Sequence, residues 1–253
     1  MKTVIKIGTS TIAHRGGRLN IRRTQNLCEI ISDIKNAGHE IIIVTSGAIG
    51  MGVGKLGLPG RPDDIAGKQA AAAVGQCELM YTYDRLFSQY SHTVAQILLT
   101  ASDFQSEERH RNFENTVGRL LGLGAIPIIN ENDTVATDEI GVGDNDTLSA
   151  MVAVSVGADL LVLLSDIDGL YTADPHTDPS AELVTRVRSV GEVAGFGGDS
   201  YGKLGTGGMK TKLAAAEFCL KNGTDMIIAN GRYPELLYDI IDGKEGKFTL
   251  FRA

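Results

Sequence analysis

Short stretches that are apolar on both faces recur along this chain, with helical patterns between them. They occupy residues 4–7, 40–45, 125–129, 159–164 and 224–229. A strand without an alternating polar face must be covered on both sides, as a parallel strand inside a sheet is. Because helical patterns separate the stretches, the sequence predicts an α/β fold, a three-layer α/β/α sandwich with a mainly parallel, open central sheet.

The intervening segments complete this prediction. Helical periodicity and capping residues predict helices at 21–37, 64–90, 106–122, 148–156, 212–222 and 234–242, and further strands at 92–99, 182–187 and 247–252. Asn20 and either Asp144 or Asn145 are the expected N-caps. Pro127 argues against a deep position for its strand. We expect one domain over 1–253, with lobes at about 1–156 and 157–253.

Composition limits the classes of partner. The net charge of -7 and a pI near 5.3 argue against nucleic-acid binding, which needs a basic surface. The isolated cysteines Cys28, Cys77 and Cys219 are expected in the core of a protein from a reducing compartment. The sequence contains neither a signal peptide nor an apolar run of membrane-spanning length. We therefore expect a soluble, cytoplasmic protein that binds neither nucleic acid nor membranes.

A glycine-rich stretch at 204–213 reads L-G-T-G-G-M-K-T-K-L and leads into an alanine-rich helix. Glycines allow backbone N–H groups to converge, and a helix N-terminus attracts anions. Lys210 and Lys212 add positive charge, so one interpretation is a phosphate-binding loop; a flexible surface loop is the equally weighted alternative. Met209 breaks the P-loop pattern, and Lys210 replaces the third glycine of the dinucleotide fingerprint.

Glycine and polar residues follow the apolar stretches where strands are expected to end. Gly8, Ser46, Asp133 and Ser165 stand at or just beyond these points. Ligands of open α/β sheets bind beyond the carboxyl ends of strands. Lys6 lies inside a strand, which is costly unless it is paired or binds an anion; the alternative is an edge strand with this side chain in water.

These residues favour phosphoryl transfer, which needs positioning and positive charge more than covalent help. None of the histidines is placed as a general base. A carboxylate acceptor needs no base, since the reference pKa of glutamate is about 4.3. The sequence therefore favours a carboxylate as the phosphoryl acceptor, although turn and capping roles for Asp133 and Asp146 are the alternative.

Five motifs follow one another in order along nearly the whole chain. They are K-I-G-T-S at 6–10, V-T-S-G-A-I at 44–49, I-N-E-N-D at 129–133, V-G-D-N-D at 142–146 and G-T-G-G-M-K-T-K at 205–212. Together they resemble the amino acid kinase family, and the third and fourth resemble its members that phosphorylate glutamate. The resemblance implies transfer of the ATP γ-phosphate to the side-chain carboxylate of L-glutamate, the first step of proline biosynthesis.

The resemblance also implies residue roles. Lys6 and Lys212 would be catalytic, with Asp146 holding them in place. Glutamate would be bound by Ser46, Gly47, Asp133 and Asn145, with Asp133 facing its α-ammonium. The nucleotide would be bound by Lys6, Gly8, Ser165, Asp166, Thr206, Gly207, Gly208, Met209, Lys210, Thr211 and Lys212. Magnesium would be held through the phosphates of ATP, without a metal site made of protein ligands.

Partners follow from the same resemblance. Many members carry a further C-terminal RNA-binding-like domain, whereas this chain ends at Ala253, and we expect catalysis without it. A homo-oligomer, feedback inhibition by proline and transfer of the product to glutamyl phosphate reductase are implied. Two alternatives stand beside this hypothesis: a non-catalytic proline or glutamate sensor on the same fold, and a sibling kinase with another carboxylate acceptor.

Overall fold

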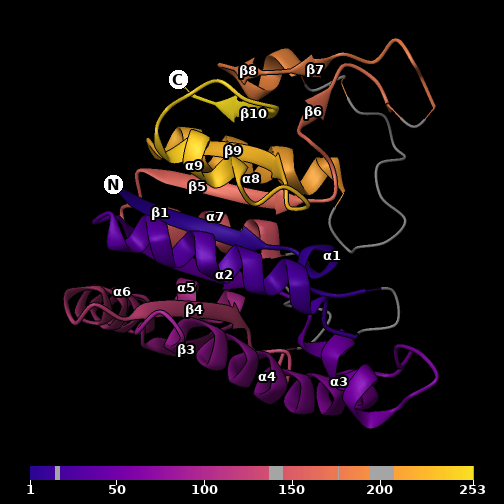
Figure 1. The fold of residues 1–253 in the computed structure, drawn as a ribbon, viewed down its shortest axis with the longest axis vertical. Coiled ribbons are helices and arrows are strands. Elements are labelled where there is room, and N and C mark those ends of the chain that lie inside the picture. Colours follow the sequence, from indigo (N-terminus) through magenta and orange to yellow (C-terminus); the bar gives the residue numbers. More distant parts are fainter. Residues whose placement is uncertain (15–17, 137–144, 176, 194–195, 197–207, 253) are drawn as a thin grey trace.

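The computed structural model describes residues 1–14, 18–136, 145–175, 177–193, 196 and 208–252. Its centre is an eight-stranded sheet in the order β3-β4-β2-β1-β5-β9-β10-β8 (Figure 1). The strands β3, β4, β2, β1, β5 and β9 are parallel, and β10 runs antiparallel to β9. In sheet order the bounds are Val94–Leu99, Ile126–Glu131, Glu40–Thr45, Lys2–Ile7, Leu160–Ser165, Asp225–Asn230, Phe248–Phe251 and Arg186–Val187. The predicted mainly parallel sheet is confirmed.

The helices cover both faces of this sheet. They are α1 Thr9–Ile12, α2 Ile21–Asn36, α3 Ala48–Leu56, α4 Ile65–Ser88, α5 Ala101–Gln105, α6 Glu107–Gly122, α7 Asn145–Ser155, α8 Met209–Lys221 and α9 Leu236–Ile241. A 3-10 turn, η1 Val190–Val193, and a small hairpin of β6 Leu170–Tyr171 and β7 Leu183–Val184 complete the described elements. Within these ranges, none of the helices combines the length and the apolar character needed to cross a lipid bilayer.

Two hydrophobic cores lie on opposite faces of the sheet because side chains alternate along each strand. Ile5 belongs to the core that α2, α4 and α9 cover. Val4 belongs to the other core, which α6, α7 and α8 cover. These two cores make the predicted three-layer sandwich. Lys6 shares the face of Val4 and therefore points toward α7 and α8.

Side-chain caps set the starts of α2 and α4, and the first of them is the N-cap that the sequence predicts. The Asn20 side chain accepts a hydrogen bond from Arg23 N, and Asp64 accepts one from Gly67 N. The predicted helix at 148–156 starts earlier, at Asn145, which lies inside the helix. Asp144, the other expected cap, is outside the described residues.

Three details of the prediction were wrong. Pro127 lies in an interior strand, because β4 is flanked by β3 and β2; its ladder to β2 begins only at Ile128, beyond the proline. Cys77 is exposed, since the neighbouring Gln76 takes the inward-facing position on α4, whereas Cys28 and Cys219 are buried as expected. Residues 182–187 form two separate short strands, β7 and β8, in different sheets.

Helices α3 and α4 pack so closely that glycine is required between them. A Cβ added at Gly75 would lie 1.7 Å from the carbonyl oxygen of Ala48, which is backbone and cannot turn aside. We expect Gly75→Ala to lower the free energy of unfolding by about 1–3 kcal/mol through overpacking. Gly118→Ala in α6 is the matched control, because an added Cβ there meets nothing within 4 Å. It should instead stabilise by about 0.5–1 kcal/mol. Urea unfolding measures both, and similar stabilities would contradict this packing argument.

Candidate active site

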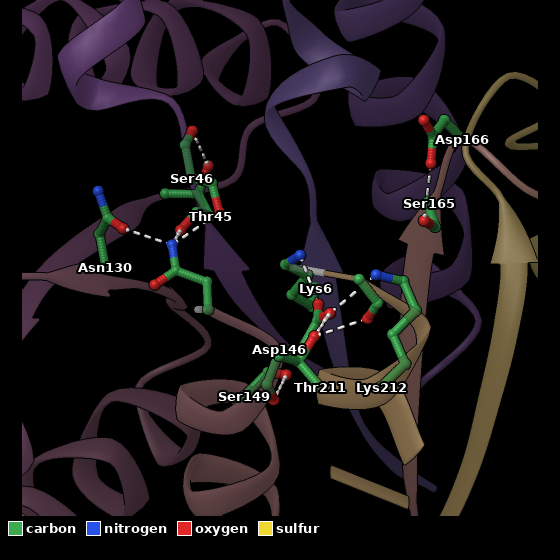
Figure 2. Close-up of polar contacts among 12 residues, drawn as sticks. Lys6, Thr45, Ser46, Asn130, Asp146, Ser149, Ser165, Asp166, Thr211 and Lys212 are labelled. Carbon is green, nitrogen blue, oxygen red and sulfur yellow. Dashed lines mark hydrogen bonds and ion pairs between the residues drawn. The ribbon is translucent and has the colours of Figure 1, made fainter. Parts of the chain in front are cut away.

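The carboxyl ends of the parallel strands meet at one edge of the sheet, and the polar residues gather there. Figure 2 shows Thr45, Ser46 and Asn130 on one side, Lys6 and Asp146 in the middle, and Ser165 with Asp166 on the other. This arrangement follows from the strand order, in which β1 lies between β2 and β5. The polar residues that follow the predicted strand ends therefore lie together at the edge of the sheet where ligands of open α/β folds bind.

A buried triad of charges occupies the middle of this edge. Lys6 Nζ lies 2.6 Å from Asp146 Oδ1, and Lys212 Nζ lies 2.9 Å from Asp146 Oδ2 (Figure 2). Asp146 is fully buried, and the two lysines are 8% and 6% exposed. The alternative of an edge strand with Lys6 in water is thus wrong, since β1 is a central strand. Residues from both ends of the chain share one carboxylate.

The electrostatics of the triad favour an anion. Burial opposes ionisation of Asp146, but the charges of Lys6 and Lys212 and their hydrogen bonds outweigh it and lower the pKa of this carboxyl to about 2. Counted over these three described residues alone, two ammonium groups and one carboxylate give a net positive charge in a place with little water. A phosphoryl group that gains negative charge would be stabilised at such a position.

Helix starts add to this field. Asp146 is in the first turn of α7, and Lys212 is in the first turn of α8, whose N-cap is Gly208. The Thr211 hydroxyl donates to Gly208 O at 2.8 Å and lies 3.4 Å from Asp146 Oδ2. Helix N-termini carry a partial positive charge and unpaired N–H groups, so two of them meeting here reinforce the preference for an anion.

Two glycines shape the loops next to the triad. A Cβ added at Gly8 would lie 3.3 Å from Leu164 O, a tight contact, and 3.8 Å from Lys6 Nζ, at ordinary van der Waals distance. Gly47 adopts φ 98°, in the left-handed region, as the residue before α3. That conformation favours glycine and turns the chain sharply after β2.

An amide group connects the ends of β2 and β4 to α7. Asn145 Nδ2 lies 2.7 Å from Thr45 O, 2.6 Å from Ser46 Oγ and 3.1 Å from Asn130 Oδ1. The structure thus brings together two of the predicted glutamate-binding residues, Ser46 and Asn145. Within the described ranges, Asp133 makes no hydrogen bond with either of them. Burial raises the pKa of Asp133, although Arg61 opposes this shift.

The residues expected at the nucleotide are placed less completely. Ser165 Oγ donates to Asp166 Oδ1 at 3.2 Å at the end of β5. Met209 is buried at the start of α8, whereas Lys210 is exposed and lies outside the triad. Thr206 and Gly207 lie outside the described residues, so the glycine-rich stretch is placed only from Gly208 onward.

The structure also shows polar groups that sequence reasoning missed. Asp168 accepts from Asn230 Nδ2 at 2.7 Å and pairs with Lys247 Nζ at 2.8 Å. Burial opposes ionisation there, but these partners and Tyr171 lower the pKa of Asp168. Asn130 lay within a quoted motif but had no assigned role, and Gln76 within an alanine-rich helix gave no signal at all.

Comparisons with known proteins match most of the chain. A family model described as "Amino acid kinase family" matches residues 1–230. The chain is 48% identical to the glutamate 5-kinase of Clostridium perfringens, over 96% of this chain and 93% of that protein. It is 49% identical to the glutamate 5-kinase of Symbiobacterium thermophilum, with the same coverage. The crystal structure of T. acidophilum isopentenyl phosphate kinase has a TM-score of 0.69 at 19% identity, covering 100% of both chains, which is a likeness in fold.

Proposed function

This chain belongs to the amino acid kinase family, and we propose that it transfers the γ-phosphoryl group of ATP to the side-chain carboxylate of L-glutamate. The products are L-glutamyl 5-phosphate and ADP, in the first step of proline biosynthesis. Identities of 48% and 49% to glutamate 5-kinases over 96% of the chain support this substrate. The observation that carries the chemistry is the buried Lys6–Asp146–Lys212 triad.

The order of groups along the sheet edge suggests how the substrates lie. Ser46, Gly47, Asp133 and Asn145 follow β2 and β4 or begin α7, so they would bind the amino acid on the N-terminal lobe. Ser165, Asp166 and the start of α8 would bind the nucleotide on the C-terminal lobe. The triad lies between these groups, where the phosphoryl would pass from one substrate to the other.

The chain's own residues can support this transfer without a general base. The glutamate side chain is ionised at neutral pH, so it attacks the γ-phosphorus directly. Lys6 and Lys212 would neutralise the charge on the transferring oxygens and on the leaving ADP. Asp146 touches neither substrate in this scheme; it fixes the direction of both ammonium groups.

Magnesium completes the proposal as a partner of ATP. Both Asp146 oxygens already face ammonium groups, so this carboxylate suits lysine positioning better than metal binding. Held by phosphate oxygens, the ion would need few protein ligands and would neutralise phosphate charge. The wider proposal includes a cytoplasmic location, a homo-oligomer, feedback inhibition by proline and transfer of the labile product to glutamyl phosphate reductase.

A direct assay tests the proposed function. With ATP, Mg²⁺ and glutamate, the protein should form an acyl phosphate that hydroxylamine traps as a hydroxamate. We expect kcat/KM for glutamate to exceed that for aspartate by about 10- to 200-fold, the usual effect of one methylene. N-acetylglutamate and carbamate complete the comparison. A preference for one of them would identify a sibling kinase, and glutamate binding without turnover would identify a sensor.

A further inference from the structure

Gln76 ends a chain of side-chain amides that starts in the proposed amino-acid site. Asn145 Nδ2 lies 3.1 Å from Asn130 Oδ1, and Asn130 Nδ2 donates to Gln76 Oε1 at 2.9 Å. Gln76 is 8% exposed and Asn130 is 1% exposed, so water does not substitute for these contacts. Gln76 comes from α4, which supplies none of the residues expected to touch a substrate.

The direction of every amide in this chain is fixed by a backbone group. Thr45 O can only accept, so the atom of Asn145 that lies 2.7 Å from it must be the nitrogen. The oxygen of Asn130 must then face that nitrogen, and its own nitrogen must face the oxygen of Gln76. Turning any one amide would place two donors or two acceptors against each other.

This direction decides what the site offers to a ligand. Asn145 Nδ2 also lies 2.6 Å from Ser46 Oγ, so its two hydrogens are shared among Ser46 Oγ, Thr45 O and Asn130 Oδ1. Ser46 Oγ accepts in this contact and keeps its own hydroxyl hydrogen for another partner. Asn145 is left with its carbonyl oxygen, which accepts no hydrogen bond from any described residue. The site thus offers one acceptor and one donor, the pair that an α-ammonium group and a neighbouring carboxylate require.

Stability alone does not explain an amide at position 76. Gln76 Nε2 is buried and has no hydrogen-bond partner in the described part of the chain. A buried donor without a partner is destabilising, and a methionine of similar length would avoid it. A Cβ added at the neighbouring Gly75 would lie 1.7 Å from Ala48 O, so this part of α4 packs against the start of α3, which follows the Ser46–Gly47 turn.

We propose that Gln76 is a positioning residue for the amino-acid substrate. Its Oε1 holds Asn130, and Asn130 in turn supports the orientation of Asn145 in which the carbonyl oxygen faces the α-ammonium group. Gln76 touches no substrate atom in this scheme. The inference rests on the proposed function, because it assumes that an α-amino acid binds beside Ser46 and Asn145.

Steady-state kinetics on the full chain test this role. Gln76→Met removes the acceptor, so the KM for glutamate should rise about 5- to 30-fold, as the loss of a buried hydrogen bond predicts. The KM for ATP and kcat at saturating glutamate should change less than about threefold, because the triad is untouched. Gln76→Glu keeps an acceptor at the same place and should restore most of the affinity.

A double-mutant cycle tests whether Gln76 acts through Asn130. If it does, Gln76→Met combined with Asn130→Leu should raise KM no more than Asn130→Leu alone, whereas independent effects multiply. Gln25→Met on the exposed part of α2 is the control and should leave every constant unchanged. Urea unfolding shows that each variant is folded.

The outcomes separate this inference from the proposed function. Hydroxamate formation by the wild type establishes the function first. If the wild type prefers an acceptor other than glutamate, the KM for that acceptor is compared between wild type and variants in the same way. An unchanged KM in Gln76→Met overturns the positioning role. Equal losses in Gln76→Met and Gln76→Glu also overturn it, since they would assign the effect to Nε2 or to packing. If the increases in KM caused by Gln76→Met and Asn130→Leu multiply in the double variant, Gln76 does not act through Asn130.

Discussion

Lys212→Ala should lower kcat by about a thousandfold while the KM for glutamate changes less than about threefold. Charge on the transferring phosphoryl oxygens grows in the transition state, so a cation at this position contributes more there than in the ground state. Removing a comparable cation in other phosphoryl-transfer enzymes costs about 10³- to 10⁵-fold. The lysine is 6% exposed, so little water is present to replace its charge.

The matched control for this variant lies on the same helix. Lys221→Ala removes an exposed lysine from the last turn of α8, where it pairs with Glu217 at 2.7 Å. We expect its kcat to stay within twofold of the wild-type value, because a surface pair contributes about 0–1 kcal/mol. Hydroxamate formation under saturating ATP and glutamate measures both variants. Wild-type turnover by Lys212→Ala would contradict the role of the triad.

The sheet could be predicted from the sequence because its signal is local. Strand β2 has the predicted bounds, Glu40–Thr45, since an apolar run covered on both faces leaves few alternatives. The prediction for Pro127 was wrong because it used the general preference of proline for edge strands without knowledge of the strand register. The free-energy cost of a proline in a sheet depends on whether its missing N–H faces a neighbouring carbonyl group, and only the assembled sheet shows this.

The convergence of Lys6 and Lys212 on Asp146 could be anticipated in part. A lysine inside an apolar strand implies a buried counter-charge, but it does not say which of 31 acidic residues supplies it. The resemblance of the motifs to a known family identified Asp146 as that residue. No motif pointed to Gln76. Its partner Asn130 is 54 positions away and on another element, so their contact forms only when α4 packs against β4.

Asp146→Asn should be the most destabilising polar substitution in the site. The change keeps the side-chain volume but deprives two buried ammonium groups of the carboxylate that they share. Breaking a buried charge pair in this way costs about 3–5 kcal/mol. Turnover should also fall, by about a hundredfold, because both lysines lose the group that directs them. Asp242→Asn, at an exposed pair with Lys244, should change stability by less than about 1 kcal/mol.

The pH dependence of unfolding provides an independent measurement for Asp146. Its pKa is lowered from 3.8 to about 2 in the folded protein, so its ionised form stabilises the fold above the unfolded value. That contribution is lost as the pH falls from about 4 to about 2. The stability difference between wild type and Asp146→Asn should therefore shrink across this interval, by about 2 kcal/mol at 1.36 kcal/mol per pKa unit. A difference that stays constant from pH 5 to pH 2 would show that the lysines do not hold this carboxylate ionised.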